Sequence, residues 1–189
     1  LEARLANGPA DLTTAMPDAM EELVKKGRVV AGSVAPYMTA PLGVSVRAGA
    51  PKPDISTVEA FKAALLQAKS IVMVDPNTGT SGKHLAKVFA DLGIADALQP
   101  KLKTLGGGYV VEPVAKGEIE LGLQQITEIL PVKGVKLAGP LPAPLQKVTV
   151  YTALLGTSAK QPELARKFLA LLKTPEVRAA LGKAGFMAE

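Results

Sequence analysis

Two periods of hydrophobic and polar positions alternate along the chain, which predicts strands and helices in succession. Short runs that are apolar throughout, or at every second residue, favour strands. They occur at 42–49 (LGVSVRAG), 70–74 (SIVMV), 119–125 (IELGLQQ), 134–140 (GVKLAGP) and 147–156 (KVTVYTALLG). "PADLTTAM" near the start predicts a further short strand or turn.

Apolar residues at helical spacing predict helices between these strands. Their ends carry the usual signals, such as Pro17 at a start, Gly27 after an end, and Ser56 with Glu59 as a capping box. Thr174 before Pro175 predicts the cap of the last helix. The predicted helices are 1–8, 17–27, 57–69, one from about 80 to Gly93, a short one near Pro113, and two C-terminal helices from Pro162 and Pro175.

The alternation of strands and helices predicts an α/β fold with a largely parallel sheet. Two Pro-rich joints, APKPDIS (50–56) and PLPAPLQ (140–146), bracket a central block. They predict a two-lobe protein whose discontinuous lobe one comprises 1–48 and 149–189 and whose lobe two comprises 49–148. The alternative is a single sheet with Pro-rich loops.

Composition narrows the classes of function. The chain has 189 residues, a net charge of +5 and only 4% aromatic residues, and its basic residues are spread along the sequence. Neither a basic stripe nor an aromatic platform for nucleic acid is present, so no nucleic-acid partner is expected. The mildly positive field suits a small anionic ligand, although a basic solvated surface explains it equally.

Metal and thiol chemistry are disfavoured by residue counts. The sequence contains no Cys and one His, His84, so neither a disulfide nor a His- or Cys-rich metal site is expected, and no cofactor is predicted. The sequence has no apolar run of about eighteen residues that would predict a membrane span.

The segment 75–89 (DPNTGTSGKHLAKVF) carries the main chemical signal. It predicts a strand, a loop of small residues and a helix, an arrangement that can hold an anion on free backbone N–H groups. A nucleotide P-loop is excluded by spacing, because Asn77 and His84 occupy positions that the motif reserves for Gly and Ser/Thr. An anion site and a plain Gly-rich turn both remain open.

The motifs together resemble those of a known family. LGVSVRAGAPKPDIS, DP followed by GTSG, LGIADAL, GGG, GLQQI and the final AGF are similar to motifs of solute-binding proteins of ABC importers, in the type II, molybdate-binding-like group. The resemblance covers essentially the whole chain. It implies a two-lobe, monomeric, periplasmic or extracytoplasmic protein that binds a small oxyanion or organic acid in a cleft, passes it to a membrane permease and is not an enzyme.

The resemblance also implies the ligand-binding residues. They are Thr80, Ser81 and Gly82 in the first loop, Gly107, Gly108 and Tyr109 in the second, and Gln125 where molybdate binders have a Tyr. The N–H groups of Ser81 and Gly107 are expected to converge on one ligand. Gln125 brings an acceptor as well as donors, which favours a protonated or organic acid over a bare dianion. The family's N-terminal strand–helix–strand unit has no counterpart in this sequence.

Two other functions remain open. A non-transport sensor would use the same cleft. A hydrolase would need Ser81 and His84 as nucleophile and base, but no G-x-S-x-G elbow surrounds Ser81.

Overall fold

The structure is a computed structural model that describes residues 10–15, 17–33 and 35–187. It divides into two compact units, Leu1–Ala40 with Thr149–Glu189 and Pro41–Val148. The division into lobes at 48/49 and 148/149 stays a prediction, and the helix expected over 1–8 lies outside the described residues.

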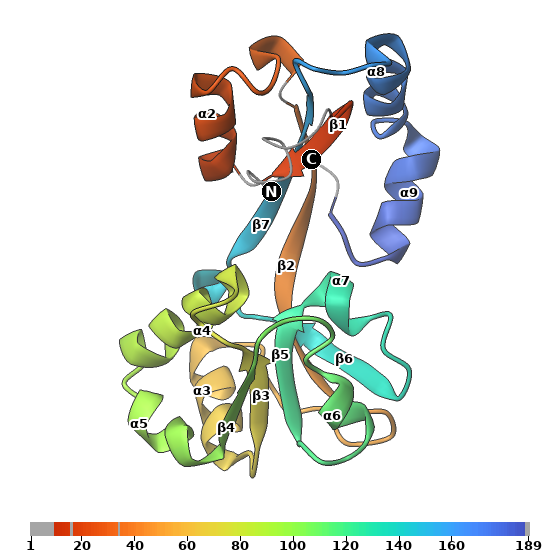
Figure 1. Ribbon diagram of the computed structural model, residues 1–189. Helices are drawn as coiled ribbons and strands as arrows, with labels where there is room; N and C mark the ends of the chain where they lie inside the picture. The colour runs from red at the N-terminus through yellow and green to blue at the C-terminus, as the bar shows by residue number, and fades with distance from the viewer. Residues whose placement is uncertain (1–9, 16, 34, 188–189) are drawn as a thin grey trace. The chain divides into compact units, whose positions relative to one another are not determined.

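The central unit, Pro41–Val148, is a mixed α/β layer structure (Figure 1). Its strands lie in the order β6-β2-β5-β3-β4. They are residues 41–47 of β2 (Ala35–Arg47), β3 (Ile71–Val74), β4 (Leu102–Leu105), β5 (Leu121–Gln125) and β6 (Val135–Pro140). Its helices are α3 (Val58–Gln67), α4 (Thr80–Asp91), α5 (Ala95–Leu98), α6 (Glu112–Ala115) and α7 (Ile126–Ile129), with 3-10 helices η2 (Gln99–Lys101) and η3 (Ala143–Leu145).

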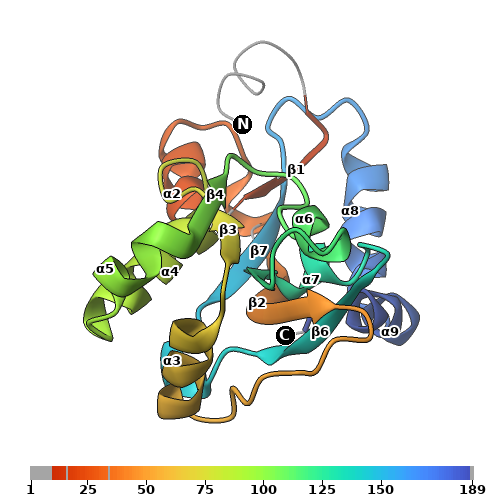
Figure 2. The same cartoon turned by 90° about the horizontal axis from the view of Figure 1, so that it is seen from below.

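Strand β3 is buried on both faces and separates two hydrophobic clusters. Ile71 and Met73 join the cluster formed with α3, α4 and α5, whereas Val72 and Val74 join the cluster formed with α6 and α7. This alternation is the two-residue period of a strand, and it explains why SIVMV reads as an uninterrupted apolar run. Figure 2 shows α3 and α4 on one side of this sheet and α6 and α7 on the other.

The second unit has a smaller core. Strand β1 (Leu12–Ala15) pairs antiparallel with β7 (Val148–Leu155), with Leu12 opposite Leu155. Met20 and Leu23 of α2 (Pro17–Lys25) pack with Val29 and Leu154. The unit also contains η1 (Ala31–Ser33), α8 (Pro162–Leu171) and α9 (Pro175–Lys183).

The prediction of an α/β fold is confirmed, but that of a largely parallel sheet is wrong. Only the β3–β4 and β3–β5 pairs are parallel among the described ladders, and β2 pairs antiparallel with both β5 and β6. The short strand β4 was missed because only Leu102 and Leu105 are apolar in it, and both are half-buried.

The predicted cap of α3 is also displaced by one residue. Thr57, not Ser56, accepts a hydrogen bond from the Ala60 N–H, at 3.1 Å. Ser56 is already engaged, because Asp54 Oδ1 accepts hydrogen bonds from its N–H and its hydroxyl. The predicted Thr174 cap of α9 is confirmed.

Candidate functional site

The loops that the sequence analysis singled out follow neighbouring parallel strands of the central unit. Val74 at the end of β3 is in register with Leu105 at the end of β4, and β5 pairs with β3 on the other side (Figure 1). The carboxyl ends of parallel strands lie at one edge of a sheet, where α/β proteins commonly bind ligands. The segments 75–79 and 106–111 and the end of β5 therefore leave the sheet at the same edge.

The start of α4 presents unpaired backbone donors. Asp75 shapes the preceding turn, since its Oδ1 accepts from the Asn77 N–H at 2.7 Å and its carbonyl accepts from the Gly79 N–H at 3.0 Å. Gly79 is the N-cap and supplies no side-chain cap. None of the described residues accepts a hydrogen bond from the N–H of Thr80, Ser81 or Gly82. These donors and the helix dipole together favour an anion.

Gly82 is required for packing at this position. A Cβ added to it would lie 2.1 Å from the carbonyl oxygen of Val74, a separation far inside van der Waals contact. The absence of a side chain thus lets the first turn of α4 lie directly against the end of β3. The close approach buries Ser81, whose exposed fraction is 8%.

The second loop also has free donors and a backbone conformation that requires glycine. Gly107 and Gly108 have φ values of +137° and +74°, which only glycine adopts readily. No described residue accepts from the N–H of either glycine. A hydrogen bond to a carbonyl group of the loop holds it in place, since the Gln124 Nε2 donates to the Gly108 oxygen at 2.7 Å.

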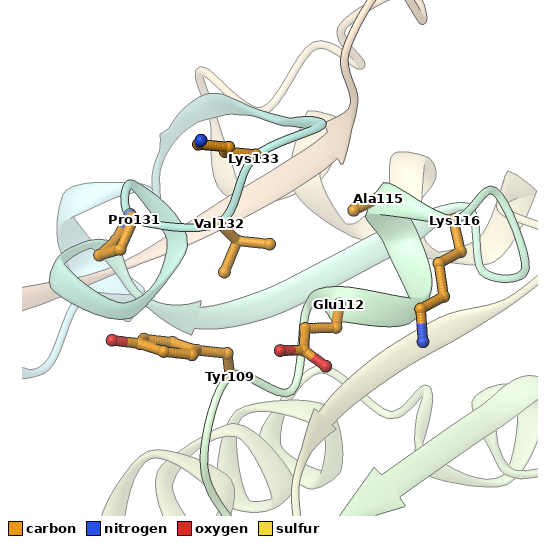
Figure 3. A pocket seen from close by; sticks show the side chains of 7 residues that line it. All are labelled: Tyr109, Glu112, Ala115, Lys116, Pro131, Val132 and Lys133. Carbon is orange, nitrogen blue, oxygen red and sulfur yellow. The ribbon is translucent and has the colours of Figure 1, made fainter.

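Tyr109 borders a pocket of about 510 Å³ within the central unit. In Figure 3 its ring lies opposite Pro131 and Val132, with Glu112 beside it. Ala115, Lys116 and Lys133 complete the lining. The Tyr109 side chain is half exposed, at 51%, so it is not part of the core.

The end of β5 places two glutamines and a glutamate near the second loop. Gln124 and Gln125 are both buried, with exposed fractions of 1% and 7%. Glu128 follows in α7, and burial raises the pKa of its carboxyl group, while a hydrogen bond from the Gln124 side chain acts in the opposite direction. The Oε1 of Gln124 is buried and has no hydrogen-bond partner.

All seven predicted ligand-binding residues lie in the central unit: Thr80, Ser81, Gly82, Gly107, Gly108, Tyr109 and Gln125. They belong to segments at the carboxyl ends of β3, β4 and β5. Their contact with a ligand stays a prediction. Glu128 is not among the residues predicted from the sequence, although a carboxylate three residues after a strand that ends in two glutamines is a usable signal.

His84 is engaged elsewhere. Its Nε2 donates to the Leu145 carbonyl at 2.9 Å and so links α4 to η3. No hydrogen bond between Ser81 and His84 occurs in the described part of the chain, so the arrangement gives no support to a Ser–His nucleophile.

Metal and membrane sites find no support in the described ranges. No cluster of three or more His, Cys, Asp or Glu residues there is arranged to hold a metal ion. Within the same ranges, no helix combines the length and apolar character needed to cross a bilayer.

Comparison with known proteins defines the class. Residues 1–187 match the family described as bacterial extracellular solute-binding protein. The structure is similar to a substrate-binding domain of a putative molybdenum ABC transporter from Clostridium difficile, with a TM-score of 0.82 and 17% identity over 98% of this chain and 80% of that one. It is also similar to the periplasmic molybdate-binding protein of Azotobacter vinelandii, with a TM-score of 0.74 and 23% identity over 98% and 81% of the two chains.

The chain belongs to the bacterial extracellular solute-binding protein family, and the resemblance to solute-binding proteins of ABC importers is confirmed. One relative changes the functional interpretation. The aconitate isomerase of Pseudomonas sp. is 33% identical over 184 residues, which cover 96% of this chain and 69% of that protein.

This relative contradicts the expectation that the chain is not an enzyme. That expectation came from the family resemblance, and it was supported by the lack of Cys, of a His-rich metal site and of a G-x-S-x-G elbow. An isomerisation that only moves a proton requires none of these, since one suitably placed acid–base group suffices.

Proposed function

We propose that this chain is the extracytoplasmic, periplasmic solute-binding component of an ABC-type importer and that its solute is a small organic acid with several carboxylate groups. The observation that carries the proposal is the set of unpaired N–H groups of Thr80, Ser81, Gly82, Gly107 and Gly108, on loops that follow adjacent parallel strands. Backbone donors of this kind hold carboxylates and oxyanions without an Arg.

Gln125 favours a carboxylic acid over a bare tetrahedral dianion. It is buried at the end of β5 and brings a carbonyl acceptor together with its N–H donors. A dianion such as molybdate offers acceptors only, so an acceptor aimed at it costs binding energy. An organic acid with a hydroxyl or a protonated carboxyl group offers a hydrogen-bond donor as well as acceptors, which a bare dianion does not. The name of the Pseudomonas relative, which refers to a tricarboxylate, points to the same class.

A ligand screen tests the proposal. We expect citrate or trans-aconitate, at one hundred times its Kd, to stabilise the protein by about 2.7 kcal/mol in thermal denaturation, and molybdate and sulfate to do so less. Titration calorimetry with molybdate on wild type and Gln125→Tyr is the matched comparison. Micromolar molybdate binding by the wild type, with no gain in the variant, would contradict the role given to Gln125.

The proposed interaction with a membrane permease is tested in a separate experiment. An importer component stimulates the ATPase of its cognate permease complex in proteoliposomes when the solute is present. A sensor built on the same site leaves that ATPase unchanged and instead changes the activity of a receptor.

A second candidate function is isomerisation of an unsaturated tricarboxylate, favoured by the 33% identity to the Pseudomonas enzyme. The double bond of such a substrate migrates when one proton leaves a methylene carbon and one proton returns at the far alkene carbon. Proton NMR of cis-aconitate incubated with the protein tests this directly. We expect trans-aconitate to accumulate. If none forms although the protein binds citrate, the isomerase function is wrong and only the binding function remains.

A further inference from the structure

The side-chain oxygen of Gln124 lacks a hydrogen-bond donor. The amide has two N–H groups and one carbonyl oxygen. Its nitrogen donates to the Gly108 carbonyl at 2.7 Å and its side chain also bonds the Glu128 carboxylate. The Oε1 is buried without a partner, and leaving such an acceptor unpaired in a protein interior is unfavourable.

A protonated Glu128 carboxyl group could donate a hydrogen bond to this oxygen. A carboxylic acid and a primary amide can form two hydrogen bonds at once: the acid carbonyl accepts from the amide N–H, and the acid O–H donates to the amide oxygen. The carboxylate form can make only the first of these. Gln124 is thus complementary to a protonated Glu128, while the unprotonated form leaves Oε1 unpaired.

The geometry points to Glu128 as the proton-transfer residue of this site, acting on an unsaturated tricarboxylate held by the glycine loop, an inference that rests on the proposed isomerisation. Gln124 connects Glu128 to Gly108, so the carboxyl group is two hydrogen bonds from the loop that offers free N–H donors. Burial raises the pKa of Glu128, which makes its carboxylate a stronger base than an exposed one.

The proposed step balances without a further reactant. The Glu128 carboxylate takes a proton from the methylene carbon, and the C–H electron pair becomes a new C=C bond as the old π pair moves onto a carboxylate. The resulting dienolate is stabilised by the N–H groups of the glycine loop. The Glu128 O–H, held meanwhile by Gln124 Oε1, returns the proton to the far alkene carbon. No electrons are gained or lost overall.

Other carboxylates at this edge are less suited. Asp75 Oδ1 already accepts the Asn77 N–H and shapes the turn before α4. Glu120 is not at this edge, because it precedes β5, and it already accepts the Lys69 N–H at 2.7 Å. Glu112 is exposed, so it lacks the burial that distinguishes Glu128.

The test measures chemistry and binding separately in the full chain. Isomerisation of cis-aconitate is followed by proton NMR, and deuterium uptake from D₂O into the methylene group is recorded in the same spectra. Citrate binding, which involves no isomerisation, is measured by calorimetry. The variants are Glu128→Gln, Glu128→Asp and, as a matched control, Glu118→Gln, which alters an exposed glutamate of the same unit.

We expect Glu128→Gln to lower the isomerisation rate by about 100-fold or more, to abolish deuterium uptake and to change the Kd for citrate by less than about threefold, while Glu118→Gln matches the wild type. An active wild type with Glu128→Gln within threefold of it would overturn this inference and leave the isomerase function standing. A wild type that binds citrate but never isomerises would overturn the isomerase function, and this inference with it. If Glu128→Gln does not fold, Glu128→Asp decides: unchanged activity after the carboxyl group is withdrawn by one methylene contradicts the assignment.

Discussion

At the scale of single residues, the candidate site depends on the directions in which consecutive side chains of β5 point. Gln124 and Gln125 are consecutive in β5, so their side chains leave opposite faces of the sheet. Gln124 faces the glycine loop and bonds Gly108, on the side where Gly122 meets Val111 and Val114. The two glutamines thus lie on different faces of β5, and different roles are proposed for them.

The first residue-scale prediction concerns Glu128 and pH. Because burial raises its pKa above the ordinary value of 4.5, the folded chain holds this proton more tightly than the unfolded chain does. The stability from this group is fully present below pH 4.5 and is lost as pH rises through the folded pKa. Glu128→Gln, which supplies a permanent N–H for Gln124 Oε1, should therefore stabilise the protein at pH 8 by about 1 kcal/mol and have little effect at pH 4.

Urea denaturation of both proteins at the two pH values measures this. Glu118→Gln is the control and should show no such pH dependence. Equal effects of Glu128→Gln at both pH values would mean that burial does not shift this carboxyl group.

The second residue-scale prediction is that Gly82→Ala destabilises the central unit. The new Cβ would lie 2.1 Å from the Val74 carbonyl, and backbone cannot move aside as a flexible side chain can. We expect a loss of about 1–3 kcal/mol, the usual range for overpacking, in chemical denaturation. Gly106→Ala is the control, because a Cβ added at Gly106 would meet nothing within 4 Å; a similar loss in both variants would show that the contact is not the cause.

At the scale of elements, the anion site depends on how α4 begins. Gly79 precedes the helix in an extended conformation, with φ −141° and ψ 146°. A residue with this ψ accepts a following proline without strain, and proline is well tolerated in the first turn of a helix. The N–H of residue 80 can therefore be removed while the helix is kept.

We predict that Thr80→Pro weakens ligand binding while α4 remains folded. A hydrogen bond to a charged group contributes about 1.5–3 kcal/mol, which corresponds to roughly 10- to 100-fold in affinity. Calorimetry with citrate measures the effect, and Thr80→Ala, which keeps the N–H, is the control. If the two variants bind alike, the N–H of residue 80 is not a ligand contact.

At the scale of the whole molecule, the central unit has the features of an independently folding domain. It is one continuous segment, Pro41–Val148, and it contains two hydrophobic clusters, one on each face of β3. The other unit is built from two chain segments that meet in the β1–β7 ladder.

We predict that a chain of residues 41–148 folds by itself with a cooperative urea transition and native near-ultraviolet circular dichroism. A chain that joins the other two segments through a short linker is the comparison, and it should be the less stable of the two because its described core is smaller. A non-cooperative transition for 41–148 would show that its two clusters depend on the rest of the chain.

The sequence by itself determined most elements and the family. The apolar runs of β3, β5 and β7, the cap at Thr174 and the Gly-bearing segments after β3 and β4 are local patterns, and local patterns follow from backbone and side-chain preferences that neighbours in sequence set. The expectation that the chain is not an enzyme is contradicted by the Pseudomonas relative, because residue counts can disfavour a metal or thiol site but do not exclude proton transfer by a single acid–base group.

Tertiary structure decided strand direction, the helix cap and the chemistry at Gln124. The antiparallel pairing of β2 depends on which strands meet across long sequence separations. Thr57 became the cap because Asp54 had engaged Ser56. Burial raises the pKa of Glu128 and leaves the Gln124 Oε1 without a hydrogen-bond partner, and burial is a property of the packed chain and not of any short stretch of it.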